Sequence, residues 1–386
     1  MRKFYTAEAV TEGHPDKLCD QIADAILDVC LKNDENSRVA CEVLATKGNI
    51  IVAGEITSAY KPDVFAVVRK VLSDVGYSSE GVTMDTFVHR QSPDIAEAVN
   101  ASKERRGGVS DNQIDWFQGA GDQGVMIGYA CDETKQLMPM PVVLANRIVR
   151  ELSACRQSSY IQGILPDGKA QVTVEYENGK PVRLDSVVVS CQHKEEKDLK
   201  KLEAEIRKKV LLPALRPLPP DEETKIYINP SGRFVCGGLD ADTGLTGRKL
   251  MVDSYGSMVP HGGGAFAGKD CSKVDRSAAY MARYIAKNIV AAGLASKCQV
   301  SLAYAIGVAQ PVMVQVDTFG TGNVCADDCL ELAIPLVFGL TPKQIVDTLR
   351  LTRPIFRQTA AFGHFGRKEF PWEHTDKAEA LRNAVI

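Results

Sequence analysis

The chain has 386 residues, a length that suggests two or three domains. Apolar residues make up 45% and charged residues 25%, which is ordinary for a globular protein. The net charge of −3, from 46 basic and 49 acidic residues, excludes a global positive field that would attract nucleic acid, so any basic site must be local.

The 11 cysteines have irregular spacing and form no CxxC pair, which argues against a disulfide framework or a zinc site. The first residues, MRKFYTAEAVTEGHPDK, lack the apolar run of a signal peptide. No stretch approaches the roughly 18 uncharged apolar residues of a membrane span. We therefore expect a cytoplasmic protein with reduced thiols, no membrane segment and no nucleic-acid partner.

Taken in chain order, the predicted elements begin with a helix over 16–33, just after Pro15. Its apolar face is formed by Leu18, Ile22, Ile26 and Val29. Strands are predicted near 37–46 and 49–57, separated by the turn signal Lys47-Gly48-Asn49, and a second helix covers about 62–75.

The same order returns twice. The second unit has a helix over about 139–158, strands near 169–177 and 181–191 joined by Glu177-Asn178-Gly179-Lys180, and a helix over about 195–211. The third has a helix over about 273–294, strands near 297–307 and 311–318, and helical segments from about 327. The recurrence either arises by chance or marks three similar α+β units, each with helices on one face of a sheet.

Two segments interrupt this order. The polar stretch 100–121 has no period and is long for a loop, so we expect a lid or a disordered insert. The stretch 213–223 is a proline-rich connector. The predicted division is an N-terminal domain over 1–99, a mobile active-site loop over 100–118, a central domain over 119–228 and a C-terminal domain over 229–386.

The run His261–Asp275 is the most informative. Its glycines allow close approach of the backbone to a ligand, Lys269 and Lys273 supply charge, and a helix begins near 273, where free N–H groups favour an anion. Gly263-x4-Gly268-Lys269 nearly matches a P-loop, but Asp270 replaces the Ser or Thr that would hold magnesium, and no apolar strand precedes it. A glycine-rich turn without a ligand and another kind of phosphate cradle remain alternatives.

Several other polar residues have both a structural and a functional interpretation. Asp275 either forms a capping box with Ser272 or binds magnesium. Arg248 and Lys249 form either a solvated basic turn or a grip on phosphate, and Asp240 or Asp242 before them could contact a ribose hydroxyl.

The same two interpretations apply near the N-terminus. Asp16, in a first helical turn, either complements the helix dipole or binds metal. His14 could donate to a leaving oxygen. Lys169 is a surface residue by default, and the glycine-rich run 119–124 is a weak signal by itself.

Together these segments resemble the S-adenosylmethionine synthetase (methionine adenosyltransferase) family of the bacterial and eukaryotic type. The matching runs are TEGHPDK at 11–17, GEIT at 54–57, QSPDI at 91–95, GAGDQG at 119–124, NPSGRFVCGG at 229–238, GLTGRK at 244–249, HGGGAFAGKDCSKVDRSAAY at 261–280 and GHFGR at 363–367. The resemblance extends from about residue 3 to 380. It implies three similar α+β domains around a pseudo-threefold axis and a mobile loop over the active site.

The resemblance also implies a two-step reaction. The sulfur of L-methionine attacks C5′ of ATP and expels triphosphate, which is then hydrolysed to pyrophosphate and phosphate. A thioether is neutral and has a free lone pair, so it needs no general base. Stabilisation of the polyanionic leaving group should therefore be the largest catalytic effect.

By match to the family motifs, the implied catalytic residues are His14, Lys169, Arg248 and Lys269. The implied ATP contacts are His14, Asp167, Lys169, Arg233, Phe234, Asp242, Arg248, Lys249, Ala265 and Lys269. The implied methionine contacts are Glu55, Gln91, Asp122, Asp242 and Lys273. Asp16 and Asp275 would hold two Mg²⁺ ions per site, and Glu42 would bind K⁺ unless it is only an outward strand residue.

The family assembly is a homotetramer, a dimer of dimers with active sites between two subunits. The expected division places segments from 11–122 of one subunit opposite segments from 230–275 of the other. Two alternatives share parts of the pattern: a P-loop-like kinase or nucleotidase, which would leave ADP, and a non-catalytic nucleotide sensor, which could lose His14, Lys169 or Arg248 without harm to binding.

Overall fold

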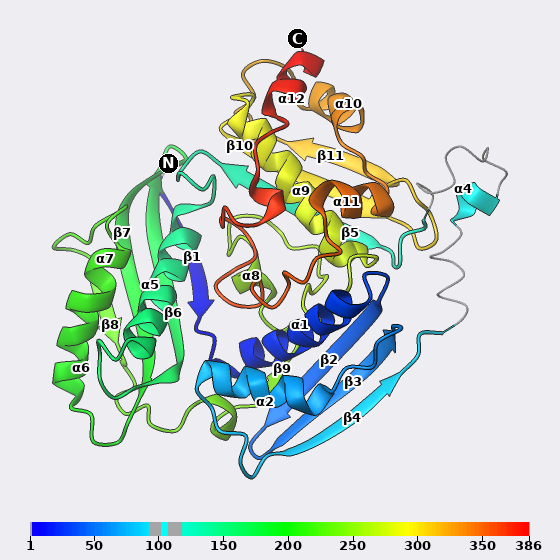
Figure 1. The fold of residues 1–386 in the computed structure, drawn as a ribbon. Helices are drawn as coiled ribbons and strands as arrows, with labels where there is room; N and C mark the ends of the chain where they lie inside the picture. The colour runs from blue at the N-terminus through cyan, green and yellow to red at the C-terminus, as the bar shows by residue number, and fades with distance from the viewer. Residues whose placement is uncertain (1, 93–101, 107–117, 386) are drawn as a thin grey trace.

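The computed structural model describes residues 2–92, 102–106 and 118–385. It contains three β-sheets around the centre of the molecule, each with a long helix on one face (Figure 1). The predicted α+β class with three similar units is therefore confirmed. The predicted mobile loop over 100–118 lies mostly outside the described residues; within it, α4 (Lys103–Arg106) is described.

The first sheet has the order β4-β3-β2-β9. β2 (Arg38–Thr46) and β3 (Asn49–Thr57) are antiparallel, β4 (Thr83–His89) runs parallel to β3, and β9 (Gly244–Leu245) pairs with β2. α1 (Pro15–Asn33) and α2 (Val64–Val75) cover one face. Because side chains alternate along a strand, Val39, Cys41 and Val43 are buried while Glu42 is on the open face.

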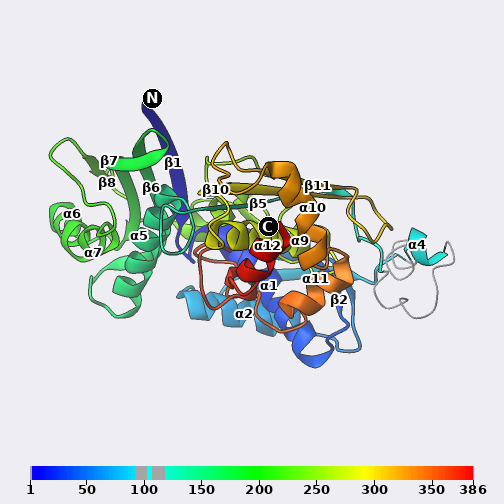
Figure 2. The ribbon, with the colours of Figure 1, turned by 90° about the horizontal axis from the view of Figure 1, so that it is seen from above.

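The second sheet has the order β1-β6-β7-β8. Its strands are β1 (Arg2–Val10), β6 (Ile164–Glu177), β7 (Lys180–His193) and β8 (Lys225–Ile228). α5 (Met140–Gln157), α6 (Leu199–Ile206), the π-turn η2 (Arg207–Leu211) and α7 (Leu212–Ala214) accompany it. Seen from above, α5, α6 and α7 lie on the same side of these strands (Figure 2). The predicted hairpin turn is confirmed, with φ of 50° at Asn178 and 79° at Gly179.

The third sheet has the order β11-β10-β5 and consists of β5 (Gly124–Cys131), β10 (Lys297–Tyr304) and β11 (Met313–Asp317). α9 (Val274–Ala291) packs on it. The C-terminal part adds α10 (Asp327–Val337), α11 (Pro342–Leu349), the 3₁₀ turn η4 (Pro371–Glu373) and α12 (Ala378–Val385). The loops also contain the 3₁₀ turn η3 (Gly238–Asp240) and α8 (Leu250–Asp253).

The sheets do not follow the expected segments 1–99, 119–228 and 229–386. β1 from the first segment pairs with β6 of the second, β5 of the second pairs with β10 of the third, and β9 of the third pairs with β2 of the first. Each unit thus takes one strand from its neighbour. The boundaries remain a prediction, and these pairings bring residues far apart in the sequence to the same place.

Several predicted bounds are wrong by a few residues, for local reasons. The helix predicted from 195 starts at 199, because the Asp198 carboxylate accepts the Lys201 N–H at 2.7 Å and so sets the N-cap. The helix predicted to reach 294 ends at 291, where Gly293 has a φ of 69°. Within the described residues no single helix is long and apolar enough to cross a membrane; only α10 and α11 together, bent by 76°, pass that test by length and composition.

Candidate active site

The N-terminus of α1 carries the first group of polar residues. Pro15 opens the helix, and the Nδ1 atom of His14 accepts the backbone N–H of Asp16 at 3.2 Å. Burial and, next, the charge of Lys249 lower the His14 pKa to about 4. A neutral imidazole that accepts through Nδ1 carries its proton on Nε2, so His14 is a donor near neutral pH.

The loop 244–249 lies against this helix end. A Cβ atom on Gly244 would collide with the Pro15 carbonyl, so only glycine fits there. Asp16 accepts the Leu245 N–H at 3.0 Å and pairs with Lys249 Nζ at 2.5 Å and Arg248 Nε at 3.5 Å. Burial opposes ionisation of Asp16, but the bonds from Lys249 and Leu245 outweigh it and hold its pKa below the usual value.

β6 brings two more residues to the same place. Thr11 donates its N–H to the Gly168 carbonyl at 3.0 Å, which aligns 166–169 with the chain just before His14. The half-exposed Lys169 and Asp242 both act electrostatically on the His14 imidazole, Lys169 lowering and Asp242 raising its pKa. Asp167 is buried and accepts the Gly238 N–H at 2.8 Å, and burial raises its pKa. These residues form what we call the α1 cluster: His14, Asp16, Asp167, Lys169, Asp242, Arg248 and Lys249.

Arg233 and Phe234 lie beside this cluster, at the end of β7. The backbone of Phe234 exchanges hydrogen bonds with His193, and Gln192 binds both the Asp167 N–H and the Val235 carbonyl. Phe234 is half-buried, and Arg233 is exposed and pairs with Glu195 at 2.6 Å. Arg233 and Phe234, both expected ATP contacts, are thus linked to Asp167 through Gln192 and its neighbour His193.

A second group surrounds the N-terminus of α9. Lys269 Nζ pairs with the Asp275 carboxylate at 2.6 Å, and Lys273 pairs with Asp270. Gly264 lies so close to Asp275 that a Cβ atom would collide with its side chain. Gly121, the residue before Asp122, packs against the Ser272 carbonyl and the Lys273 backbone. We call Asp122, Lys269, Asp270, Lys273 and Asp275 the α9 cluster.

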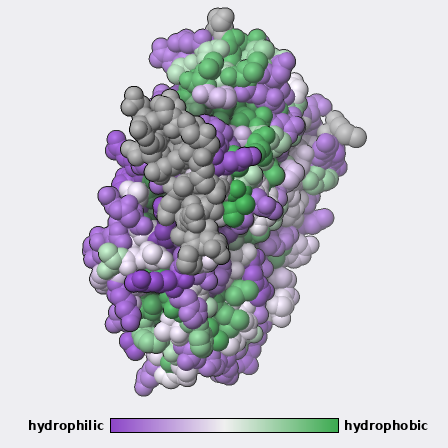
Figure 3. Space-filling view, turned by 90° about the vertical axis from the view of Figure 1, so that its right-hand side faces the viewer, coloured by the Kyte–Doolittle hydropathy of each residue, from purple (hydrophilic) through white to green (hydrophobic). Residues whose placement is uncertain are grey.

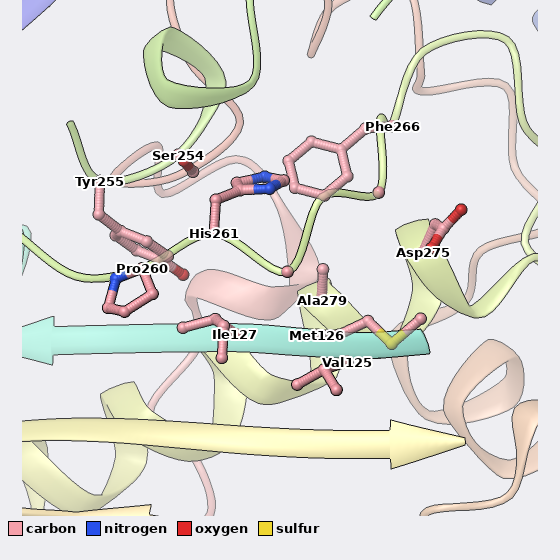
Figure 4. A pocket seen from close by; sticks show the side chains of 12 residues that line it. Val125, Met126, Ile127, Ser254, Tyr255, Pro260, His261, Phe266, Asp275 and Ala279 are labelled. Carbon is pink, nitrogen blue, oxygen red and sulfur yellow. The ribbon is translucent and has the colours of Figure 1, made fainter. Parts of the chain in front are cut away.

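Figure 4 shows a pocket next to the α9 cluster. Asp275 at the start of α9, Phe266 and His261 border a small pocket over β5, which contributes Val125, Met126 and Ile127. The capping box considered for Ser272 and Asp275 does not form, because the helix begins at Val274 with Lys273 as its N-cap and Asp275 pairs with Lys269. Asp275, in the first turn of α9, therefore faces the loop that carries Gly264 and Lys269.

Three other predicted residues are on the first sheet or at its edge. Glu55 on β3 is paired with Ala40, which in turn forms a β-bridge with Lys269. Glu42 is exposed and hydrogen-bonds the Thr246 hydroxyl. Gln91 follows β4 and donates its N–H to the Thr57 hydroxyl at 3.2 Å.

The α1 and α9 clusters do not merge into one site within the chain. Leu245 is bound by Asp16 and Gly268 by Asp24, eight residues further along α1, so about 12 Å of helix separates the two attachment points. The segments 244–249 and 11–17 meet within one chain, whereas the expected contact of segments from 11–122 with segments from 230–275 of another subunit stays a prediction. Ala265, predicted to contact ATP, belongs to the loop that carries Lys269 but lies against Gly247: a Cβ atom added to Gly247 would be 2.7 Å from the Cβ atom of Ala265. Ala265 therefore lies between the two clusters.

Three family models together match almost the whole chain. Residues 2–99 match the N-terminal domain of S-adenosylmethionine synthetase, residues 117–234 its central domain and residues 236–374 its C-terminal domain. The chain belongs to the S-adenosylmethionine synthetase family. Its activity is that of a methionine adenosyltransferase, with ATP and methionine as substrates.

Nothing favours the kinase alternative. In a P-loop the glycine-rich run follows a strand, whereas residues 254–261 of this synthetase form turns after α8. The described residues also contain no group of three or more His, Cys, Asp or Glu side chains placed to hold a metal ion.

Sequence reasoning missed a set of buried charged residues between the two clusters. Lys17 pairs with Asp20 and Asp253, and Arg276 pairs with Asp24 at 2.6 Å. One signal could have found the acidic members: aspartates recur at every fourth position of the first helix, on a segment that is otherwise mostly buried.

Proposed function

We propose that the synthetase reaction takes place between the α1 cluster of one chain and the α9 cluster of a second copy. The main support is that each cluster contains lysine and aspartate side chains in contact, an arrangement suited to a polyphosphate with bound metal. Within one chain, α1 separates the two clusters. A second copy placed with its α9 cluster against the α1 cluster would unite them. The predicted tetramer would then be a pair of such dimers.

In this proposal the sulfur lone pair of methionine forms the S–C5′ bond as the C5′–O bond of ATP breaks. His14 donates its Nε2 proton to the leaving oxygen, because its Nδ1 atom is already occupied by the Asp16 N–H. Lys169, Lys249 and the partner's Lys269 neutralise the triphosphate, and Arg248 serves its hydrolysis. Bound Mg²⁺ would add charge neutralisation at the phosphate oxygens.

The metal ligands we propose are Asp16 and Asp275 for Mg²⁺ and Glu42 for K⁺. Each of the two aspartates already faces lysine Nζ, at 2.5 Å and 2.6 Å, and so occupies a place where a cation is favoured. Glu42 is exposed on the open face of its sheet and has the Thr246 hydroxyl as a neighbouring oxygen ligand.

The substrate contacts we propose follow the same two groups. Phe234 would stack on adenine, and Arg233, Asp167, Asp242 and Ala265 would complete the nucleotide site. Glu55, Gln91, Asp122 and Lys273 would orient methionine together with Asp242. Supporting this division, Glu55 lies one strand away from Lys269, and Gly121, the residue before Asp122, packs against Ser272 and Lys273.

We also propose a cytoplasmic enzyme, consistent with 11 free thiols, most of them buried. The test of the proposed function is direct: the chain is incubated with ATP, methionine, Mg²⁺ and K⁺. We expect S-adenosylmethionine with equal amounts of pyrophosphate and phosphate, each dependent on methionine. Formation of ADP without a sulfonium product would contradict the proposal.

A further inference from the structure

α1 carries an aspartate at every fourth position: Asp16, Asp20, Asp24 and Asp28. At 3.6 residues per turn, such residues lie on neighbouring positions of one side, turned by about 40° from one to the next. Asp16, Asp20 and Asp24 are buried. Buried carboxylates require hydrogen-bond partners, and the partners on this helix are informative.

Each of the four carboxylates accepts at least one backbone N–H from a distant part of the chain. Asp16 accepts from Leu245 at 3.0 Å, Asp20 from Gly247 at 3.0 Å and Asp24 from Gly268 at 2.8 Å. Asp28 accepts from both Phe356 and Arg357 at 2.9 Å. The first three bonds therefore fall on the two glycine-rich loops, and the last falls on a segment outside both clusters.

Asp20 is fixed on its other side by buried charges. Its second oxygen pairs with Lys17 at 2.8 Å, and Lys17 also pairs with Asp253 in α8, directly after the loop 244–249. The side chains of Lys17, Asp20 and Asp253 are 1%, 0% and 4% exposed. The residue before Arg248 is thus held by a carboxylate that itself has almost no freedom to move.

Asp24 is fixed in the same way, near Lys269. It forms two hydrogen bonds with the Arg276 guanidinium, at 2.7 Å and 2.6 Å, and neither side chain is exposed. Arg276 also donates to the Lys269 carbonyl at 3.1 Å. Both the residue before Lys269 and Lys269 itself are therefore attached to α1.

We propose that Asp20 and Asp24 are positioning residues, which set where the two phosphate-binding loops lie along α1 and so where Arg248, Lys249 and Lys269 present their charges. This inference rests on the proposed function. Both loops are also bonded to β2, through Thr246 and Gly268, but the bonds from Asp20 and Asp24 fall on the residues directly before Arg248 and Lys269. Catalysis by preorganised charge is sensitive to such placement, and a misplacement of about 1 Å can cost about 100-fold in rate.

The experiment compares Asp20→Ala with Asp28→Ala, a matched control on the same side of the same helix whose carboxylate also accepts backbone N–H groups. We expect Asp20→Ala to lower kcat for S-adenosylmethionine formation and for cleavage of added triphosphate by about 100-fold, with KM for methionine within about twofold. Asp28→Ala should lose thermal stability but keep kcat within about threefold.

Asp20→Asn retains an oxygen that can accept the Gly247 N–H, so it should recover much of the lost kcat; it also serves as the test variant if Asp20→Ala does not fold. Equal kcat in the Asp20 and Asp28 variants, or an Asp20→Asn variant no better than Asp20→Ala, would overturn the inference. Failure of the unaltered chain to form S-adenosylmethionine would instead count against the proposed function.

Discussion

Lys169 differs from the other cations of the α1 cluster. Within the described residues its ammonium has no ion pair, whereas Lys249 and Arg248 both pair with Asp16. An unpaired cation beside His14 is free to take an incoming phosphate group. Stabilisation of the negative charge that develops on the leaving triphosphate should therefore depend strongly on Lys169.

The change Lys169→Met tests this dependence. We expect S-adenosylmethionine formation to fall by about 100- to 1,000-fold, the usual cost of removing one stabilising donor, with unchanged thermal unfolding. Steady-state kinetics and calorimetry on the same preparation would check both. Near-normal turnover would remove Lys169 from the mechanism.

Arg248 should act later in the reaction. It is half-exposed and held by Asp16 and the Thr243 carbonyl. The change Arg248→Leu should slow triphosphate cleavage more than sulfur attack, so bound triphosphate should accumulate. Rapid quenching of a single turnover measures this, and an absence of accumulation would argue against the assignment.

Asp28 provides a pH-dependent prediction. Burial raises its pKa to about 6, despite the N–H groups of Arg357 and Phe356. The folded state therefore binds the proton more tightly than the unfolded state, so the free energy of unfolding falls as the pH rises from about 4 to 6. Between pH 7 and pH 5 the wild-type chain should gain about 1 kcal/mol relative to Asp28→Asn, measured by urea unfolding. A constant difference would show that Asp28 does not titrate in this range.

At the scale of elements, the loop 262–269 depends on glycine for two separable reasons. Gly263 and Gly268 both have positive φ, 96° and 76°. A Cβ atom on Gly263 would meet nothing within 4 Å, whereas on Gly268 it would collide with the Cys41 carbonyl of β2. The pair therefore separates backbone strain from steric collision.

We expect Gly263→Ala to cost about 1–2 kcal/mol of stability from the strained φ alone. Gly268→Ala should cost about 1–3 kcal/mol more and should also displace Lys269, because the loop must move away from β2. Denaturant unfolding measures the first effect and the ATP KM the second. Similar losses in the two variants would contradict this account.

The regular elements were largely predictable from the sequence, because apolar periodicity and turn residues act locally. The helix 16–33, the hairpin strands near 37–57 and the Asn178-Gly179 turn are found close to their predicted places. β1 and β4 were not predicted, since their burial depends on partners far along the chain. The short strand β9 is defined only by its pairing with β2.

The site was predictable as a set of residues but not as an arrangement. The family motifs identified His14, Lys169 and Lys269 as site residues. They did not predict the strand pairings, which place Lys169 beside His14 and Lys269 beside Ala40. The buried Asp20 and Asp24 lie outside the family motifs, and only their fourfold spacing marks them, because an aspartate in a helix is usually exposed to solvent. Only their partners in the fold reveal what they hold.

At the scale of the whole molecule, the part of the chain that the structure describes places no helix over one face of the first sheet. Leu44 and Leu245, paired on this face, are each 37% exposed, and Phe87 on β4 is 56% exposed. Apolar residues are also visible at the lower end of the molecule, where β4 lies (Figure 3). An open apolar sheet face is suited to contact with a second copy.

If the second copy binds there, Leu44→Arg should dissociate the oligomer and lower activity in proportion to the fraction of free chains, because each chain would keep only two half-sites. Sedimentation velocity and activity at several protein concentrations would test both parts. A monomeric variant with full activity would show that one chain is sufficient.

The most direct test of the central claim mixes two inactive variants, Lys169→Met and Lys269→Met, after unfolding and joint refolding. If each site unites the α1 cluster of one chain with the α9 cluster of another, half of the sites in mixed dimers are intact, and about one quarter of the wild-type activity should return. No recovery above the separate variants, although mixed oligomers have formed, would contradict the account.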